Sequence, residues 1–375
     1  SLDWNTPYDP MLDALYVAAV GNCINDSAGL VIHSLTENTL PILDSDSFDS
    51  VPTFLRWQPY SNYFAVGGYN IDGTKDIKIY KFDTVGETVT EVFGESWWGS
   101  SPGASSFDWS DNNDFVISSS SNLFVGNFDT SNPNSWSYSG TYASVDCGAI
   151  INFVKWSKNG LYVIAGCDSG TTSEVQVYFF DDRSTLKFID SKEYSGSVSS
   201  VGWSQDDWYC YWAGDLDDEV VVEKNDFERT WTGVVGHNIP KNALAFSPNT
   251  NDIVFIDDSG ELKLKSLDFQ RIIFEEISTA SLVFGSNQSY FDVSPNGSFI
   301  AAVGYNFQGG GNKELQLFDA TSNELSSLFT LTVSDLACSV DWSSNGEFIV
   351  VANENNEIHI YELSNTDFTE IESEE

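Results

Sequence analysis

The sequence predicts an all-β protein, a single closed β-propeller of four-stranded antiparallel blades, and three observations lead to this. An apolar anchor, a short polar turn and an apolar run recur along the chain. The copies follow one another at intervals between 43 residues (Trp203 to Phe246) and 53 residues (Trp4 to Trp57). No stretch between them has helical periodicity, and each interval has room for four short strands. The anchors are Trp4, Trp57, Trp109, Trp156, Trp203, Phe246, Val293 and Trp342.

The last copy shows how one repeat divides into elements. Residues 339–342 alternate between apolar and polar, which indicates a strand, and residues 343–346 (Ser-Ser-Asn-Gly) predict a tight turn because Asn and Gly tolerate a positive φ. Residues 347–352 form the continuous apolar run of a buried strand. Residues 357–362 alternate with a period of two, and residues 367–371 alternate more weakly, as an exposed edge strand does.

A four-stranded sheet of this kind cannot bury both of its faces alone. Packing such sheets around an axis buries them, and closing the ring protects all but the outer edges. The same third strand returns in other copies, at residues 77–83, 175–181, 262–268 and 315–319. The repeat therefore predicts one propeller domain over residues 1–375.

The motif also resembles a known family. The run Phe246-Ser-Pro-Asn before an apolar strand, and an aromatic-Asp pair that closes the third strand, resemble WD40-type repeats from about Leu12 to Ile371. No copy carries the Gly-His pair of that family, and Phe-Asp, Leu-Asp or Tyr-Glu replaces the closing Trp-Asp. The resemblance implies a WD40-like propeller without the hydrogen-bonded Asp-His-Ser-Trp network.

Eight anchors predict eight blades, with seven as the alternative. Residues 5–10 separate Trp4 from its second strand, so the first copy could instead complete the last one. Residues 1–10 could also leave the ring and donate a strand to a neighbouring molecule. Residues 372–375 are predicted to be an acidic tail.

The charge of the chain excludes some partners. With 16 basic and 56 acidic residues, a net charge of −40 excludes conventional nucleic-acid binding and attraction to anionic membranes. No apolar run of 18 residues predicts a membrane span. The acidic residues either form a solvated surface or bind calcium through loop carboxylates, although no calcium-loop spacing is present. The calcium candidates are Asp44, Asp46 and Asp49 in one cluster, and Asp215, Asp217, Asp218 and Glu219 in another.

Five cysteines allow two disulfides or none. Cys147 and Cys167 flank a predicted hairpin, where facing positions suit a disulfide. Cys23 and Cys338 occupy matching strand ends in the first and last copies, where a bond would hold a closed ring together. Cys210 is predicted to be a core residue. The alternative is five reduced, buried thiols.

Composition favours a secreted protein over a cytoplasmic one. The chain starts at Ser1, lysine is scarce, and glycosylation sequons occur at Asn25, Asn287 and Asn296. Three sequons are no more than chance in a chain so rich in Asn and Ser.

No motif for catalysis is present. The three histidines (His33, His237 and His359) lie near no nucleophile motif and lack the spacing of metal ligands, and no phosphate-binding loop occurs. Paired carboxylates could hydrolyse glycosides, but the sequence cannot identify such a pair among 56 acids. We therefore predict a protein that is not an enzyme and has no cofactor.

Aromatic residues outside the repeat core are the better candidates for a contact surface. Tryptophan and tyrosine dominate protein interfaces and also stack on sugars. We predict a secreted structural or interaction subunit, which could self-assemble into a polymer. The alternatives are an intracellular WD40-like scaffold and a carbohydrate-binding or glycan-active propeller. The candidate contact residues are Trp97, Trp98, Trp136, Tyr138 and Trp231.

Overall fold

In the computed structural model, the chain divides into two compact units, Ser1–Gly202 and Trp203–Glu375. The structure describes residues 2–4, 15–24, 27–35, 41–95, 103–130, 141–169, 173–181, 185–193, 196–204, 206–214, 221–224, 244–248, 250, 252–256, 261–268, 273–282, 290–306, 312–321, 324–333, 337–353, 355, 357–364 and 367–374. Within these ranges no helix is long and apolar enough to cross a bilayer.

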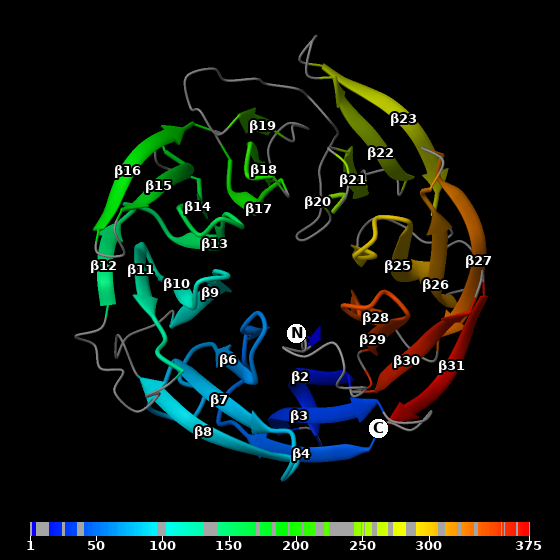
Figure 1. Cartoon of the computed structure of the whole chain (residues 1–375), viewed down its shortest axis with the longest axis horizontal. Coiled ribbons are helices and arrows are strands. Elements are labelled where there is room, and N and C mark those ends of the chain that lie inside the picture. The colour runs from blue at the N-terminus through cyan, green and yellow to red at the C-terminus, as the bar shows by residue number, and fades with distance from the viewer. Residues whose placement is uncertain are drawn as a thin grey trace. The chain divides into compact units, whose positions relative to one another are not determined.

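The described residues form eight antiparallel sheets in which neighbouring strands are consecutive in the chain (Figure 1). Seven sheets have four strands, as the repeat predicts, and one has three described strands. The first two sheets are β1 (Leu2–Trp4), β2 (Leu15–Ile24), β3 (Ser27–Leu35) and β4 (Ile42–Ser47), then β5 (Phe54–Trp57), β6 (Tyr63–Gly67), β7 (Ile77–Asp83) and β8 (Thr88–Glu95). The next two are β9 (Ala104–Trp109), β10 (Asp114–Ser119), β11 (Asn122–Asn127) and β12 (Thr141–Asp146), then β13 (Ile151–Trp156), β14 (Tyr162–Cys167), β15 (Val175–Asp181) and β16 (Thr185–Lys192).

The remaining sheets repeat this order. The three-stranded sheet is β17 (Val198–Trp203), β18 (Tyr209–Gly214) and β19 (Val221–Lys224). It is followed by β20 (Leu244–Phe246), β21 (Asp252–Ile256), β22 (Glu261–Asp268) and β23 (Ile273–Ser281), and by β24 (Tyr290–Val293), β25 (Phe299–Asn306), β26 (Asn312–Asp319) and β27 (Ser326–Val333). The last sheet is β28 (Ala337–Trp342), β29 (Phe348–Asn353), β30 (Ile358–Ser364) and β31 (Asp367–Glu374).

The turn between the first and second strands explains the Ser-x-Asn-Gly part of the repeat. In the last sheet the buried Ser343 hydroxyl donates to Asn345 Oδ1 at 2.7 Å and accepts the Phe348 N–H at 2.9 Å. Gly346 follows with a φ of 72°, which glycine adopts without strain. The turn is therefore fixed by side-chain bonds to its own backbone. Equivalent serine bonds occur at Ser157 and Ser294.

A bulge recurs between the third and fourth strands. The register shifts within the pairing of these two strands in seven sheets, for example between Ile79 and Tyr80 and between Ile360 and Tyr361. A bulge adds one residue to one strand and increases the local twist. The other shifts fall at Ile32/His33, Val125/Gly126, Val177/Tyr178, Leu264/Lys265 and Leu317/Phe318.

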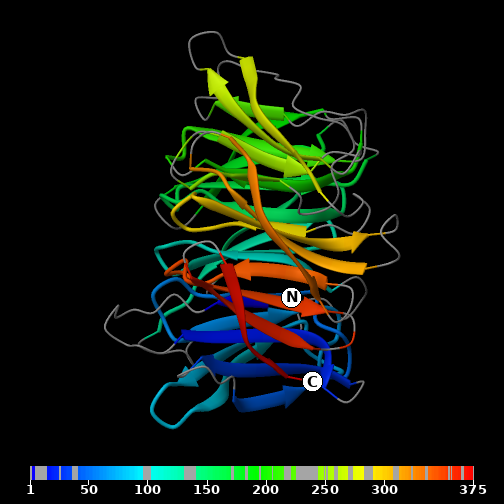
Figure 2. The same cartoon turned by 90° about the vertical axis from the view of Figure 1, so that its right-hand side faces the viewer.

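In the first unit, neighbouring sheets pack face to face. Strands β1, β5, β9 and β13 lie beside one another in that order, and separate apolar cores fill the space between successive sheets. Seen from the side, most strands of this unit, blue to green, lie roughly along one line and point alternately in opposite directions (Figure 2). The anchors Trp57, Trp109 and Trp156 are buried in these cores, as predicted.

The second unit is built in the same way. One core includes side chains of β18, β21, β22, β24, β25 and β26. Another joins the sheets β24–β27 and β28–β31 around the anchor Trp342.

Both ends of the chain lie in sheets. Strand β1 pairs with β2, with Leu2 opposite Ala19 and Trp4 opposite Val17. The opening strand, considered above for donation to a neighbour, thus pairs with its own chain, and residues 5–10 lie outside the described residues. Strand β31 includes residues 372–374 of the acidic tail, and Glu374 pairs with Ile358. The strand is longer than the predicted residues 367–371 because residues beyond the alternating apolar pattern also pair with the backbone of β30.

Candidate functional site

Several predicted site residues lie outside the described residues. These are the contact candidates Trp97, Trp98, Trp136, Tyr138 and Trp231, the acids Asp215, Asp217, Asp218 and Glu219, the sequons at Asn25 and Asn287, and His237. Cys23 and Cys338 lie on β2 and β28, but their side chains are not described.

The structure does not gather Asp44, Asp46 and Asp49 into a calcium site. Asp44 Oδ2 accepts the backbone N–H of Val89 at 2.7 Å, whereas Asp46 Oδ2 accepts the Tyr80 hydroxyl at 2.7 Å. The backbone N–H of Asp49 donates to the carbonyl of Ile71 at 2.7 Å. No group of three or more His, Cys, Asp or Glu within the described ranges could hold a metal ion. The carboxylates of Asp44 and Asp46 on β4 instead accept hydrogen bonds from the neighbouring sheet. Calcium binding by the second acidic cluster stays a prediction.

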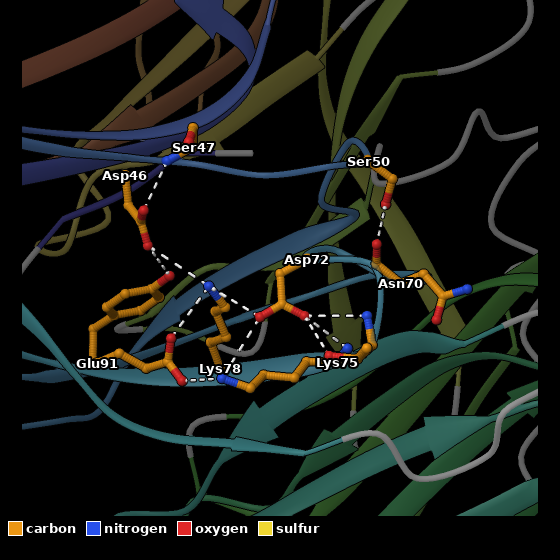
Figure 3. Close-up of polar contacts among 10 residues, drawn as sticks. Asp46, Ser47, Ser50, Asn70, Asp72, Lys75, Lys78 and Glu91 are labelled. Atoms are coloured by element: carbon orange, nitrogen blue, oxygen red, sulfur yellow. Dashed lines mark hydrogen bonds and ion pairs between the residues drawn. The ribbon is translucent and has the colours of Figure 1, made fainter.

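A buried lysine occupies the centre of the acidic cluster that Figure 3 shows. The Lys78 ammonium on β7 lies 3.2 Å from Glu91, 3.4 Å from Asp72 and 3.7 Å from Asp46. Lys75 pairs with the same Glu91 and lies 3.6 Å from Asp72. Lys78 itself is only 5% exposed. The positive charge beside Asp46 therefore comes from the Lys78 ammonium, where the sequence analysis considered a calcium ion.

The cluster shifts the pKa of three of its members. Desolvation lowers the pKa of Lys75, but the hydrogen bond to Glu91 and the charges of Glu91 and Asp72 outweigh it, so the net shift is upward. The other two are an aspartate and a tyrosine. Desolvation raises the pKa of Asp72, but N–H bonds from Lys75 and Thr74 and the charges of Lys78 and Lys75 outweigh it, so the net shift is downward. The pKa of Tyr80 is raised, first by burial and then by its hydrogen bond to Asp46. Both shifts favour an ionised carboxylate and a neutral phenol.

The predicted pair Cys147 and Cys167 lies together as free, buried thiols. The Cys167 thiol donates to Cys147, which lowers the pKa of Cys147 and, together with burial, raises that of Cys167. Cys147 Sγ also lies 3.4 Å from the hydroxyl of Tyr178. Cys210 is fully buried in β18, as predicted.

An aspartate on the first strand of one sheet accepts two hydrogen bonds from the anchor tryptophan of the next sheet. Asp3 Oδ2 accepts the Trp57 N–H at 2.7 Å, and the carbonyl of Asp3 accepts the indole N–H at 3.1 Å. Asp292 and Trp342 make the same two bonds, at 2.9 Å and 3.2 Å. We call this pair of bonds the Asp–Trp joint. The sequence analysis missed it, although Asp3 and Asp292 each directly precede an anchor.

In the first unit, the residue directly before each anchor is alternately acidic and basic. Asp3, Arg56, Asp108 and Lys155 occupy this position in succession, and Lys155 Nζ lies 3.0 Å from Asp108 Oδ1. Burial, the largest influence, raises the pKa of Asp3 to about 6 even though the nearby cations Arg56 and Lys155 lower it. Averaged over all its atoms, Asp3 is partly buried, whereas its carboxyl group is the part that loses contact with water.

The two described histidines lie on strands. His33 is buried on β3 and His359 on β30. His359 Nδ1 lies 2.7 Å from Glu370, and its Nε2 lies 3.3 Å from Glu357. These contacts hold the ring within its sheet.

Strand β16 presents apolar side chains at the edge of its sheet. Phe188 is 57% exposed and Ile189 39% exposed, and β16 pairs only with β15 in this sheet. The strand carries Lys187 and Lys192 against one acid, Asp190, in a strongly acidic chain. We call Lys187, Phe188 and Ile189 the β16 surface. The sequence analysis did not identify it, because an edge strand with apolar residues looks like any half-buried strand.

Comparison with known proteins identifies the fold. No family model and no curated protein matches the chain. Among solved structures, the C-terminal WD40 domain of Sif2 superposes with a TM-score of 0.66 at 12% identity, covering 94% of this chain and 93% of that one. Sqt1 from Chaetomium thermophilum, bound to the N-terminus of ribosomal protein L10, gives 0.63 at 14%, covering 84% and 85%.

An enzyme also appears among the similar structures. The periplasmic gluconolactonase PpgL of Pseudomonas aeruginosa gives a TM-score of 0.57 at 17% identity, covering 85% of this chain and 96% of that one. Identities this low establish the fold alone. The chain has the WD40-like β-propeller fold that its repeats predict.

Proposed function

We propose that the chain is a non-enzymatic, secreted propeller of eight blades that serves as an interaction or structural subunit. The observation that best supports this is the β16 surface. An edge strand that exposes adjacent apolar side chains is a site for association unless a partner covers it. Its lysine, Lys187, also reduces the repulsion that a net charge of −40 creates elsewhere on the chain, whereas Lys192 on the same strand pairs with Asp190 at 2.7 Å.

A protein partner fits this surface better than a small substrate does. Exposed Phe and Ile side chains on a strand edge suit burial against another polypeptide. The similar structure of Sqt1 with a segment of ribosomal protein L10 shows a propeller of this fold holding a protein. For this chain we propose only that a surface of the propeller binds another protein.

A second copy of the chain is the partner we propose first. Strand β31 has the sequence DFTEIESE and forms the edge of the last sheet, so its acids complement the lysines of β16. Contact between β16 of one copy and β31 of the next joins two different surfaces, and such contacts build rings or filaments. Repulsion between acidic copies would limit this association at low ionic strength.

Sedimentation velocity with three proteins tests the proposal. The particle mass of wild type should rise as NaCl or CaCl2 is added. Phe188→Asp should remain monomeric because it places a charge where the Phe188 side chain would be buried between two copies. Val85→Asp is the matched control, since Val85 is 93% exposed on the turn between β7 and β8. It should behave like wild type.

Two results would contradict the proposal. If wild type stays monomeric at every salt concentration, self-association is wrong. If Phe188→Asp and Val85→Asp associate equally, the β16 surface is not the contact.

A further inference from the structure

A cavity of about 190 Å³ lies in the second unit, lined by the sheets β20–β23 and β24–β27. Polar side chains from the turn before β21 line one part, among them Ser247, Thr250 and Asp252. Aliphatic side chains line another part, among them Val254, Leu264 and Ile300. Clefts for drug-sized ligands measure about 300–1,000 Å³, so this space suits a smaller group.

A substitution within the repeat accounts for the cavity. In seven described hairpins, an N–H at the start of the turn donates to the carbonyl of the residue that begins or directly precedes the second strand. That residue is aromatic in five hairpins and aspartate in two, Asp114 and Asp252. The smaller Asp252 leaves space where the other copies place a ring. The aromatic residues are Tyr63, Tyr162, Tyr209, Phe299 and Phe348.

Asp252 lacks the partner that satisfies its counterpart Asp114. Asp114 accepts a hydrogen bond from Asn127 Nδ2 at 2.9 Å, and Asn127 is its neighbour across the strand pair. The residue opposite Asp252 is Ser266. Asp252 Oδ2 accepts the Thr250 hydroxyl at 2.6 Å, but none of the described residues donates to Oδ1. This carboxylate belongs to a residue that is only 7% exposed.

Ser247 does not accept the backbone hydrogen bond that the equivalent serines accept. In the equivalent turns, the serine hydroxyl accepts the N–H of the residue that begins the second strand, as Ser294 does from Phe299 at 2.9 Å. Here the N–H of Asp252 donates to Thr250 Oγ1 at 3.2 Å instead. The Ser247 hydroxyl, on a residue 6% exposed, has no partner among the described residues. Two polar groups on largely buried residues, without partners among the described residues, therefore line one cavity and face its open space.

We propose that this cavity binds a primary alkylammonium group, which donates N–H bonds to Asp252 and Ser247. A carboxylate oxygen that faces a cavity without a protein donor can accept a bond from a ligand, and a charged donor forms the stronger bond. The field of an acidic chain concentrates cations near such a site. The aliphatic walls suit the methylene chain behind the ammonium. The group comes from a free small amine or from a lysine side chain of another polypeptide.

Isothermal titration with n-butylammonium chloride tests the site, with 1-butanol as the neutral probe of similar length. Wild type should bind butylammonium and not butanol. Asp252→Asn keeps the shape and should weaken binding about tenfold or more, because the charged bond is lost. Asp252→Phe restores the aromatic residue of the other copies and should abolish binding. Asp114→Asn is the matched control and should bind as wild type does.

A second titration separates the two sources of the ammonium. A short peptide with a central lysine should bind if a polypeptide supplies the group, and its acetyl-lysine form should not. Binding of butylammonium without binding of the peptide assigns the site to a free amine.

Three results would overturn the proposal: no binding of butylammonium to wild type, equal binding of butanol, or unchanged binding by Asp252→Asn. The last two would indicate a cavity that holds only water or apolar groups. The site does not depend on the β16 surface, so either proposal can fail without the other.

Discussion

Lys78 is one of only 16 basic residues in the chain, and it lies buried among three carboxylates. Its partners come from β4, from β8 and from the segment between β6 and β7. The sequence shows only a lysine within an alternating strand, Ile77-Lys-Ile-Tyr80. Because the partners are distant in the chain, no local pattern could predict the cluster.

Replacing Lys78 should be destabilising. Lys78→Met leaves Asp46, Asp72 and Glu91 without their central cation. Because these carboxylates are 23–39% exposed and Lys75 still pairs with two of them, the expected cost is about 1–3 kcal/mol, below that of a fully buried pair. Lys75→Met is the control, because its side chain is 29% exposed and partly exposed pairs contribute about 1 kcal/mol or less. Chemical denaturation of both variants measures the difference. Equal losses would mean that burial of Lys78 does not matter.

Asp3 should make folding stability depend on pH. Its pKa is raised from 3.8 to about 6 by burial, so the folded protein holds this proton more tightly than the unfolded chain does. The stability from this group is complete below pH 3.8 and is lost as the pH rises through about 6. Asp3→Asn keeps an acceptor for the Trp57 N–H but cannot titrate. Wild type should therefore lose stability relative to Asp3→Asn between pH 4 and about 6.5.

The measurement is the free energy of unfolding of both proteins across this range. Asp83→Asn gives a control that should not change relative to wild type in this range, because backbone N–H bonds from Val85 and Gly86 lower the pKa of Asp83 from 3.8. That group contributes stability above its ordinary pKa, which is lost on acidification. A difference between wild type and Asp3→Asn that does not change with pH would contradict the assignment.

Among the elements, the turn after each anchor fixes the hairpin. Ser343→Ala removes the acceptor for the Phe348 N–H and the donor to Asn345, and an unsatisfied buried group costs about 1–3 kcal/mol. Ser344→Ala, at the next residue of the same turn, should change the unfolding free energy by less than about 0.5 kcal/mol. Thermal or denaturant unfolding compares the two. Similar effects would show that the serine bonds do not hold the turn.

The strands of the last copy could be predicted closely. Predicted strands at 339–342, 347–352 and 357–362 correspond to β28, β29 and β30, because apolar periodicity and turn residues are local signals. The bulges between third and fourth strands and the length of β31 could not be predicted. They depend on how one strand registers against another, which the composition of a single strand does not encode.

For the whole molecule, regular repetition made the fold predictable while the sites remained hidden. Eight anchors at a near-constant spacing specify sheets that bury one another, and this holds even without the family's usual signatures. The sites arise where one copy departs from the others. Asp252 stands in place of an aromatic residue, Lys78 lies in a strand core, and β16 exposes Phe188.

The Asp–Trp joint has a consequence for how such a chain can change in length. Each joint uses an acid from one repeat and an indole from the next. The repeat with Trp57 has Arg56 in the acid position, and the repeat with Asp292 has Val293 as its anchor, so neither repeat carries both halves. A gene duplication that copies two neighbouring repeats together would copy a complete joint, whereas copying one of these repeats alone would not. The chain could thus gain or lose units as pairs without new residues having to arise between the two.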